Sequence, residues 1–268
     1  MARKKERDIF LKIIAKILLF IIKIPYYIGN GVIFLFRKIK NNTEIRNIKR
    51  KRSKIEANYQ EFDIVKSEMG SFEDWEKKIM RADSNIGIIV GARGSGKTAF
   101  GLSFLENLYA QHKKLIYAMG FKKEEMPSWI ETIENISQIK NNSFVLIDEG
   151  GILFSSRRAM SSANKLLSEL ILISRHKNIN VLFISQNSSN LDINIVRQAD
   201  YLVFKKPSLL QSNFERKTVK EIYKEITDGF ERYKAHKGLA YIYSDNFKGF
   251  IENPLPSFWS MKISKSFR

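Results

Sequence analysis

The most constraining feature of the sequence is the octet Gly91-Ala-Arg-Gly-Ser-Gly-Lys97-Thr98. It stands between an apolar run at 85–90 and a segment of helical apolar spacing at 98–114. Glycines let a backbone turn successive N–H groups inward, and the N-terminus of the following helix favours anions. The octet fits G-x-x-x-x-G-K-[ST], the phosphate-binding (Walker A) loop, in its required order of strand, loop and helix. The sequence therefore predicts an α/β fold with a nucleotide site.

The loop predicts a role for each of its residues. We expect ATP and Mg²⁺ as the ligands, with the Lys97 ammonium reaching the β- and γ-phosphates and Thr98 holding the metal. Backbone N–H groups should surround the phosphates. The predicted nucleotide-binding residues are Gly91, Ala92, Arg93, Gly94, Ser95, Gly96, Lys97, Thr98 and Ala99.

A second motif follows about fifty residues later. The apolar run 144–147 is typical of a buried parallel strand, and it ends in Asp148-Glu149. Ligands bind at the carboxyl ends of such strands. We predict Asp148 as a second Mg²⁺ ligand and Glu149 as the general base that activates water. The alternative is an acidic turn without chemistry.

Further apolar runs alternate with helical patterns along the chain. This alternation predicts a mostly parallel sheet flanked by helices. Gln186, at the end of one run, is a predicted sensor of the γ-phosphate or the attacking water; otherwise it is a solvated strand end. The expected strands are 85–90, 114–120, 144–147, 180–186 and 200–206, and the expected helices are 71–80 (with Ser71 as N-cap), 98–114 and 162–177.

Several sequence features that the chain lacks narrow the class of nucleotide-binding protein. The chain has no cysteine and only three scattered histidines, which excludes disulfides and argues against zinc. No Asn-Lys-x-Asp guanine-reading sequence is present, because Asn164-Lys165 precedes two leucines, and no LSGGQ-like signature occurs. The remaining class is the P-loop ATPase with an additional strand and a catalytic glutamate (RecA-like).

The first 58 residues differ from the rest in charge and hydropathy. Residues 1–54 hold 16 of the 46 Lys and Arg but 3 of the 28 Asp and Glu, a net charge of +13 out of +18. Residues 9–36 are strongly apolar, yet lysines interrupt them before a span of about 20 residues is reached. Lys5, Lys12, Lys16 and Lys23 fall on one helical stripe, which is typical of a helix at a bilayer surface.

Three readings of this arm stay open: an interfacial anchor, a true span or hairpin, and a helix that packs on a partner protein. The basic cluster at 37–54 suits acidic lipid or DNA phosphates. We predict two parts, a membrane-associated arm at 1–58 and a P-loop ATPase domain at 59–268 on the cytoplasmic side.

The charged segment 208–237 is interpreted as a solvated lid. The aromatic tail 238–268 is interpreted as strand-like, packed on the body or against a neighbour.

Together, the octet, the stretch "DEGGILFSSR" and the segment 174–206 resemble the FtsK–HerA group of DNA-pumping ATPases. Within this group, the chain looks most like zonula-occludens-toxin-like and viral DNA-packaging ATPases. The resemblance covers roughly residues 85–206. It implies a homo-oligomeric ring, often a hexamer, with an arginine supplied to each site by the neighbouring subunit. The candidates are Arg197 (favoured), Arg175, and behind them Arg157 and Arg158, which otherwise form a basic pore loop or a solvated loop.

Three functions fit these observations. The first is a membrane-associated ATPase motor that translocates or packages DNA for a virus or mobile element. The second is an ATPase that drives assembly or secretion of virion, coat or other proteins at a membrane. The third is a slow nucleotide-dependent scaffold, which an intact Glu149 disfavours.

Overall fold

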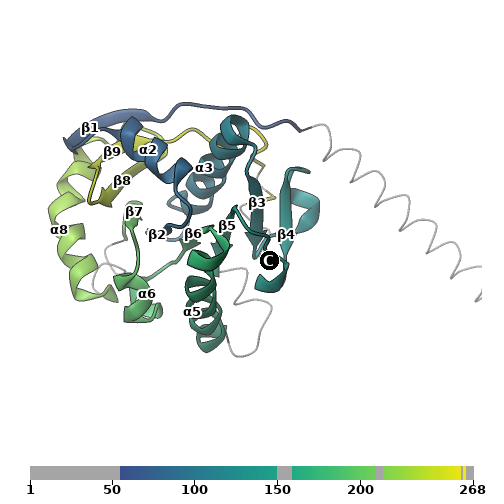
Figure 1. Ribbon diagram of the computed structural model, residues 1–268. Helices are drawn as coiled ribbons and strands as arrows, with labels where there is room; N and C mark the ends of the chain where they lie inside the picture. The colour runs from purple at the N-terminus through teal and green to yellow at the C-terminus, as the bar shows by residue number, and fades with distance from the viewer. Residues whose placement is uncertain (1–54, 150–158, 209–213, 261, 264–268) are drawn as a thin grey trace, which may run out of the picture. The chain divides into compact units, whose positions relative to one another are not determined.

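The computed structural model describes residues 55–149, 159–208, 214–260 and 262–263 (Figure 1). Two predicted features lie outside the described residues: the apolar segment 9–36 of the arm and the pair Arg157-Arg158. The predicted division into 1–58 and 59–268 stays a prediction. Among the described residues, no helix is long and apolar enough to cross a membrane.

A single nine-stranded sheet organises the described body, in the order β1-β9-β8-β7-β2-β6-β5-β3-β4. The six strands from β7 to β4 are parallel, whereas β8, β9 and β1 extend the sheet in antiparallel fashion. The strands are β1 (Asp63–Met69), β2 (Ile86–Val90), β3 (Leu115–Met119), β4 (Ile130–Ile133), β5 (Ser143–Asp148), β6 (Ile179–Ile184), β7 (Tyr201–Phe204), β8 (Leu239–Ser244) and β9 (Lys248–Glu252).

Strand β6 lies between β2 and β5. The strand that leads into the glycine loop and the strand that ends in Asp148 are therefore separated by one strand. This additional strand is the feature expected for the RecA-like class, so the predicted fold class is confirmed. The predicted strands are all found, and each begins and ends within two residues of its expected bounds.

Helices cover both faces of the sheet. On one face lie α2 (Phe72–Arg81) and α3 (Lys97–His112), and on the other α5 (Ala159–Lys177), α6 (Ile193–Arg197) and α8 (Lys217–Arg232). Short 3₁₀ turns occupy Lys123–Glu125, Ile136–Gln138 and Ser188–Asn190. The Ser71 hydroxyl accepts a hydrogen bond from the Asp74 N–H at 3.3 Å, which confirms the predicted cap of α2.

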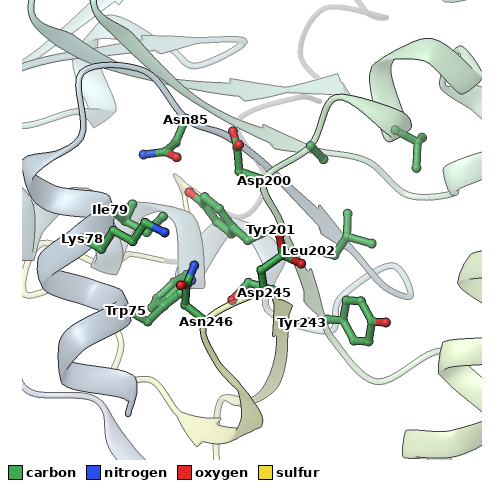
Figure 2. A pocket seen from close by; sticks show the side chains of 13 residues that line it. Trp75, Lys78, Ile79, Asn85, Asp200, Tyr201, Leu202, Tyr243, Asp245 and Asn246 are labelled. Atoms are coloured by element: carbon green, nitrogen blue, oxygen red, sulfur yellow. The ribbon is translucent and has the colours of Figure 1, made fainter. Parts of the chain in front are cut away.

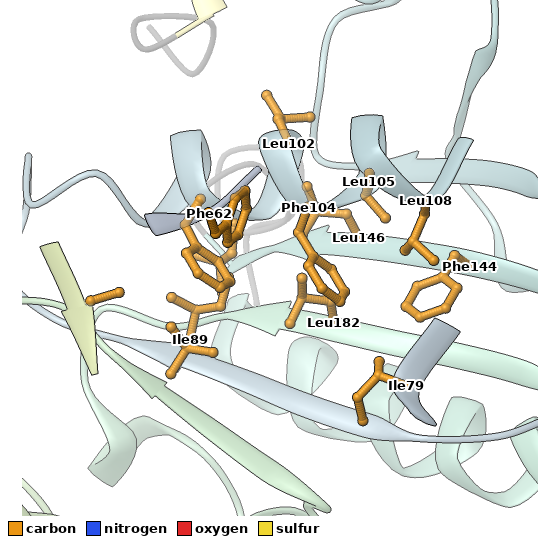
Figure 3. Packing of buried hydrophobic residues seen from close by; sticks show 14 of the residues in the cluster. Phe62, Ile79, Ile89, Leu102, Phe104, Leu105, Leu108, Phe144, Leu146 and Leu182 are labelled. Atoms are coloured by element: carbon orange, nitrogen blue, oxygen red, sulfur yellow. The ribbon is translucent and has the colours of Figure 1, made fainter. Parts of the chain in front are cut away.

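The two cores follow from strand alternation, because successive side chains of a strand point to opposite faces. Ile88 and Val90 of β2 join the cluster under α5 and α8, whereas Ile89 joins the cluster under α3. Figure 3 shows Phe104 and Leu108 of α3 directed at the sheet in this second cluster. Both faces of β2 are therefore buried, which fixes the position of the loop that follows it.

Helix α8 is part of the core, so the interpretation of 208–237 as a solvated lid was wrong. Its apolar residues recur every three or four positions and form one buried stripe. Charged residues fill the opposite face, so the overall composition of the segment is that of a solvated helix. The buried residues are Val219, Ile222, Tyr223, Ile226 and Phe230.

The predicted strand-like tail forms β8 and β9 and extends the sheet of its own chain. Beyond β9 the chain returns to α3, where Glu106 Oε2 accepts a hydrogen bond from the Ser257 N–H at 2.8 Å. The other oxygen of Glu106 accepts from the Asn58 N–H at 3.1 Å, and Asn107 Oδ1 accepts from the Gln60 N–H at 2.9 Å. One turn of α3 therefore holds segments from both ends of the described body.

The packing of α8 predicts the effect of Gly229→Ala. A Cβ at this position would lie 2.3 Å from the Phe250 ring, so we expect the free energy of unfolding to fall by about 1–3 kcal/mol. A solvated helix would instead gain about 1 kcal/mol from the same change. Chemical denaturation measures the free energy of unfolding of the variant and the wild type. Asp228→Ala, at an exposed position of the same helix, is the control and should change this free energy little. A Gly229→Ala protein more stable than the wild type would contradict the packing of α8 against Phe250.

Candidate nucleotide site

The glycine loop rests on the end of strand β7. Val90 O accepts a hydrogen bond from the Lys205 N–H at 2.8 Å, and the Ala92 N–H donates to Lys206 O at 3.2 Å. A Cβ on Gly91 would lie 2.6 Å from the Lys205 Cβ, so only glycine allows this close approach. The start of the loop is therefore held by two backbone hydrogen bonds and a tight contact.

The rest of the loop is open and fits phosphate. Gly94 and Gly96 have φ values of +76° and +90°, and nothing lies within 4 Å of a Cβ placed on Gly94. The Ser95 hydroxyl is buried and has no hydrogen-bond partner among the described residues. Positive φ values at two glycines turn N–H groups toward one side, which suits an anion. Arg93 lies at the exposed tip, and Ala99 is buried at the start of α3.

Lys97 is 7% exposed at the first turn of α3. Its ammonium donates to Gly91 O at 2.7 Å and to Ala92 O at 2.9 Å, so the side chain folds back over the loop. Burial lowers the pKa of Lys97 to about 8, and the carboxylates of Asp148, Glu149 and Glu215 oppose this shift. A buried cation surrounded by carboxylates and loop carbonyls is ready to exchange these neutral acceptors for phosphate oxygens.

Thr98 and Asp148 meet across the sheet edge. The Thr98 hydroxyl donates to Asp148 Oδ2 at 3.0 Å, which brings together the two predicted Mg²⁺ ligands from α3 and β5. Among the described residues no group of three or more acidic, histidine or cysteine side chains gathers for a metal. One carboxylate and one hydroxyl still fit Mg²⁺, because this ion takes its remaining ligands from water and substrate phosphates.

Glu149 directly follows β5 and is 3% exposed. Its Oε2 accepts from the Ser185 hydroxyl at 2.6 Å and from the Gln186 N–H at 3.2 Å, and its Oε1 accepts from the Asn190 side-chain amide at 3.4 Å. The Gln186 side chain is exposed, so its contact with Glu149 runs through the backbone. Its predicted sensor role stays a prediction, and Ser185 and Asn190 are contacts that the sequence analysis missed.

Arg175 and Arg197 lie away from this cluster. Both are exposed, Arg175 near the end of α5 and Arg197 at the end of α6, where the chain enters β6 and β7. They therefore belong to the amino edge of the parallel strands, opposite the glycine loop. The predicted role of these arginines at the site of a neighbouring subunit stays a prediction.

A hollow of about 340 Å³ also lies at this amino edge, between α2, the start of β7 and the turn from β8 to β9 (Figure 2). The Trp75 indole N–H and the Tyr201 hydroxyl line it, buried and without a partner among the described residues. Because this hollow lies at the opposite end of the parallel strands from Lys97, it is separate from the nucleotide site.

Lys205 is a further residue that the sequence analysis missed. Its side chain is fully buried, and its ammonium donates to Gly238 O at 2.6 Å, Leu239 O at 3.1 Å and Asn253 Oδ1 at 2.6 Å. Burial lowers the pKa of Lys205 to about 7. The backbone of Lys205 supports the loop while its side chain holds β8 and β9, so this residue joins the C-terminal hairpin to the phosphate site.

The fold and these contacts define a P-loop NTPase of the class with an additional strand and a catalytic glutamate. Residues 85–206 match the family model described as zonular occludens toxin (Zot). This segment runs from the strand before the glycine loop to the end of β7, and the match confirms the resemblance drawn from the sequence over the same residues. It supports an ATPase.

The chain is similar to several solved structures at low sequence identity, and no curated protein matches it. The DNA-packaging ATPase B204 from Sulfolobus turreted icosahedral virus is 16% identical, with a TM-score of 0.41 over 65% of this chain and 98% of that chain. The pCW3 conjugation coupling protein TcpA is 15% identical, with a TM-score of 0.44 over 69% and 64%. EssC from Geobacillus thermodenitrificans is 11% identical, with a TM-score of 0.43 over 70% and 43%.

The position of Lys205 predicts the effect of Lys205→Met. The substitution keeps the apolar stem but removes a donor from Gly238 O, Leu239 O and the buried Asn253 Oδ1. A buried acceptor left without a donor costs about 1–3 kcal/mol. We expect a clear fall in the free energy of unfolding and weaker binding of ATP. Thermal unfolding without nucleotide measures the first, and the increase in Tm on addition of ATP measures the second. Lys206→Met is the matched control, because Lys206 pairs with Glu231 in solvent. Equal effects of the two variants would show that Lys205 does not support the loop.

Proposed function

We propose that this protein is an ATPase that hydrolyses ATP to translocate or package DNA at a membrane, for a virus or mobile element. The observation that carries the ATPase part is the gathering of Lys97, Thr98, Asp148 and Glu149 at one edge of the sheet. Their residue types and their positions on β2–α3 and β5 are those that phosphoryl transfer to water requires.

The chemistry assigns one role to each side chain. Lys97 releases the loop carbonyls and binds the β- and γ-phosphates. Thr98 and Asp148 would hold Mg²⁺, which would neutralise phosphate charge. Glu149 accepts a proton from water as the water oxygen bonds to the terminal phosphorus and the bond to the ADP oxygen breaks. The neighbouring subunit of a ring adds a cation to the developing charge, with Arg197 favoured over Arg175.

Two observations support DNA as the polymer. The Zot match lies in the segment whose sequence resembles the FtsK–HerA group of DNA-pumping ATPases. The chain also carries a net charge of +18, and +13 of it falls in residues 1–54. Phosphate backbones attract such charge without regard to sequence.

The arm supports the membrane part of the proposal. Residues 9–36 combine a wide apolar surface with a lysine stripe, and the basic cluster at 37–54 follows them. This pattern favours attachment to an anionic bilayer surface, with the ATPase body on the cytoplasmic side. The runner-up function uses the same arm: an ATPase that assembles or secretes virion, coat or other proteins at the membrane.

Glu149→Gln tests the ATPase proposal. The amide keeps the shape of the side chain but cannot accept the proton, so we expect kcat for ATP to fall about 10²–10⁴-fold while ATP still binds. Phosphate release and binding of a fluorescent ATP analogue measure the two quantities. Glu169→Gln, at an exposed position of α5, is the control. Full activity of the Glu149→Gln variant would contradict the assignment of Glu149 as the general base.

Stimulation by DNA tests the proposed polymer. We expect double-stranded DNA to raise hydrolysis by the full chain, with an affinity that falls steeply as salt rises, because each neutralised phosphate adds about 0.9 to the log–log slope. Anionic vesicles and residues 55–268 alone are run beside it. If anionic vesicles raise the rate of ATP hydrolysis and DNA does not, the proposal of a DNA motor is wrong and the assembly function is favoured.

A further inference from the structure

The carboxylate of Glu149 is held unevenly. Each carboxylate oxygen has two lone-pair directions for hydrogen bonds. Oε2 fills both, with the Ser185 hydroxyl at 2.6 Å and the Gln186 N–H at 3.2 Å. Oε1 has only the Asn190 amide, at the long distance of 3.4 Å. Among the described contacts, Oε1 is therefore the oxygen with capacity for a further donor.

Ser185 is the stronger of the two contacts to Oε2. Its hydroxyl has one hydrogen, and two acceptors lie near it, Glu149 Oε2 at 2.6 Å and Asn187 O at 2.9 Å. The carboxylate is both closer and charged, so it takes the hydrogen. The Asn187 N–H in turn donates to the Ser185 oxygen at 3.3 Å, which leaves the hydroxyl well oriented.

The backbone keeps Ser185 in a fixed place. The Ser185 N–H donates to Ile89 O at 2.9 Å, which continues the pairing of β6 with β2 just beyond the end of β6. Ser185 is fully buried. The residue that holds the carboxylate is thus tied to the same strand that leads into the glycine loop.

The loop after Ser185 is pinned from the other side. Glu215 Oε2 accepts from the Ser188 N–H at 2.8 Å and from the Ser188 hydroxyl. The Arg216 side chain donates from Nε to Ser188 O at 3.0 Å and from its terminal nitrogen to Leu191 O. Glu215 and Arg216 stand directly before α8, whose apolar face is in the core. The segment 185–191 therefore cannot drift away from Glu149 without breaking these contacts.

We propose that Ser185 is the positioning residue for the general base: it anchors Glu149 Oε2 so that Oε1 is the oxygen that takes the proton from water. Ser185 does not touch the substrate and acts only through Glu149. This inference rests on the proposed ATPase function and adds the residue that orients its base. Ser189, exposed in the same loop, has no such contact through its side chain in the described structure.

The test is a double-mutant cycle in the full chain, with Ser185→Ala made alone and together with Glu149→Gln. Loss of one hydrogen bond to a carboxylate predicts a fall in kcat of about 10- to 100-fold, with KM for ATP and the Kd of a non-hydrolysable ATP analogue within about twofold. In the Glu149→Gln background the same change should cost less than about threefold, because residues that act through one another are not additive. Ser189→Ala is the matched control and leaves kcat unchanged.

The outcomes separate two failures. Wild-type protein without hydrolysis, or Glu149→Gln without effect, would overturn the proposed function itself. An active wild type in which Glu149→Gln lowers kcat but Ser185→Ala does not, or in which Ser185→Ala costs the same in both backgrounds, would overturn only the role of Ser185. If thermal unfolding shows that Ser185→Ala does not fold, Ser185→Cys replaces it, and its weaker S–H donor should give a smaller fall in kcat that again vanishes beside Glu149→Gln.

Discussion

The phosphate site depends on the contact between the glycine loop and the end of β7. Three of the eight loop residues are glycines and make no side-chain contacts, so the start of the loop takes its shape from what lies beneath it. Lys205 and Lys206 provide that support through their backbone, and the closeness of Gly91 to Lys205 leaves no room for another residue. Everything that presents a ligand to the phosphates, from Ser95 to Thr98, follows this supported turn.

The same support explains why the sheet is larger than a nucleotide site needs. The parallel strands place Lys97, Asp148 and Glu149 at one edge, and that is sufficient for the chemistry. The antiparallel strands β8 and β9 do not reach the phosphates. The start of β8 and the residues that flank β8 and β9 supply the oxygens that hold the Lys205 ammonium, and the backbone of Lys205 in turn supports the loop.

The sequence was sufficient to predict the features whose signals are local. Apolar runs, the glycine octet and Asp148-Glu149 each lie within a few residues. Five of the six parallel strands, the helices α2, α3 and α5 and the meeting of Thr98 with Asp148 were predicted, whereas the short β4 and α6 were not. Lys205 was missed because a lysine that follows an apolar strand has the pattern of a solvated strand end. Its partners lie 33 to 48 residues away in the chain. Helix α8 was misinterpreted because its charged face dominates its composition.

Helix α3 connects the site to both ends of the described body. It begins at Lys97, and between two and three turns later Glu106 and Asn107 bind the segments at residues 58–60 and 257. An α-helix is stiff along its axis, because each turn is braced by backbone hydrogen bonds. Tension applied to the chain before β1 or after β9 would therefore bear on the same helix whose first turn carries Lys97.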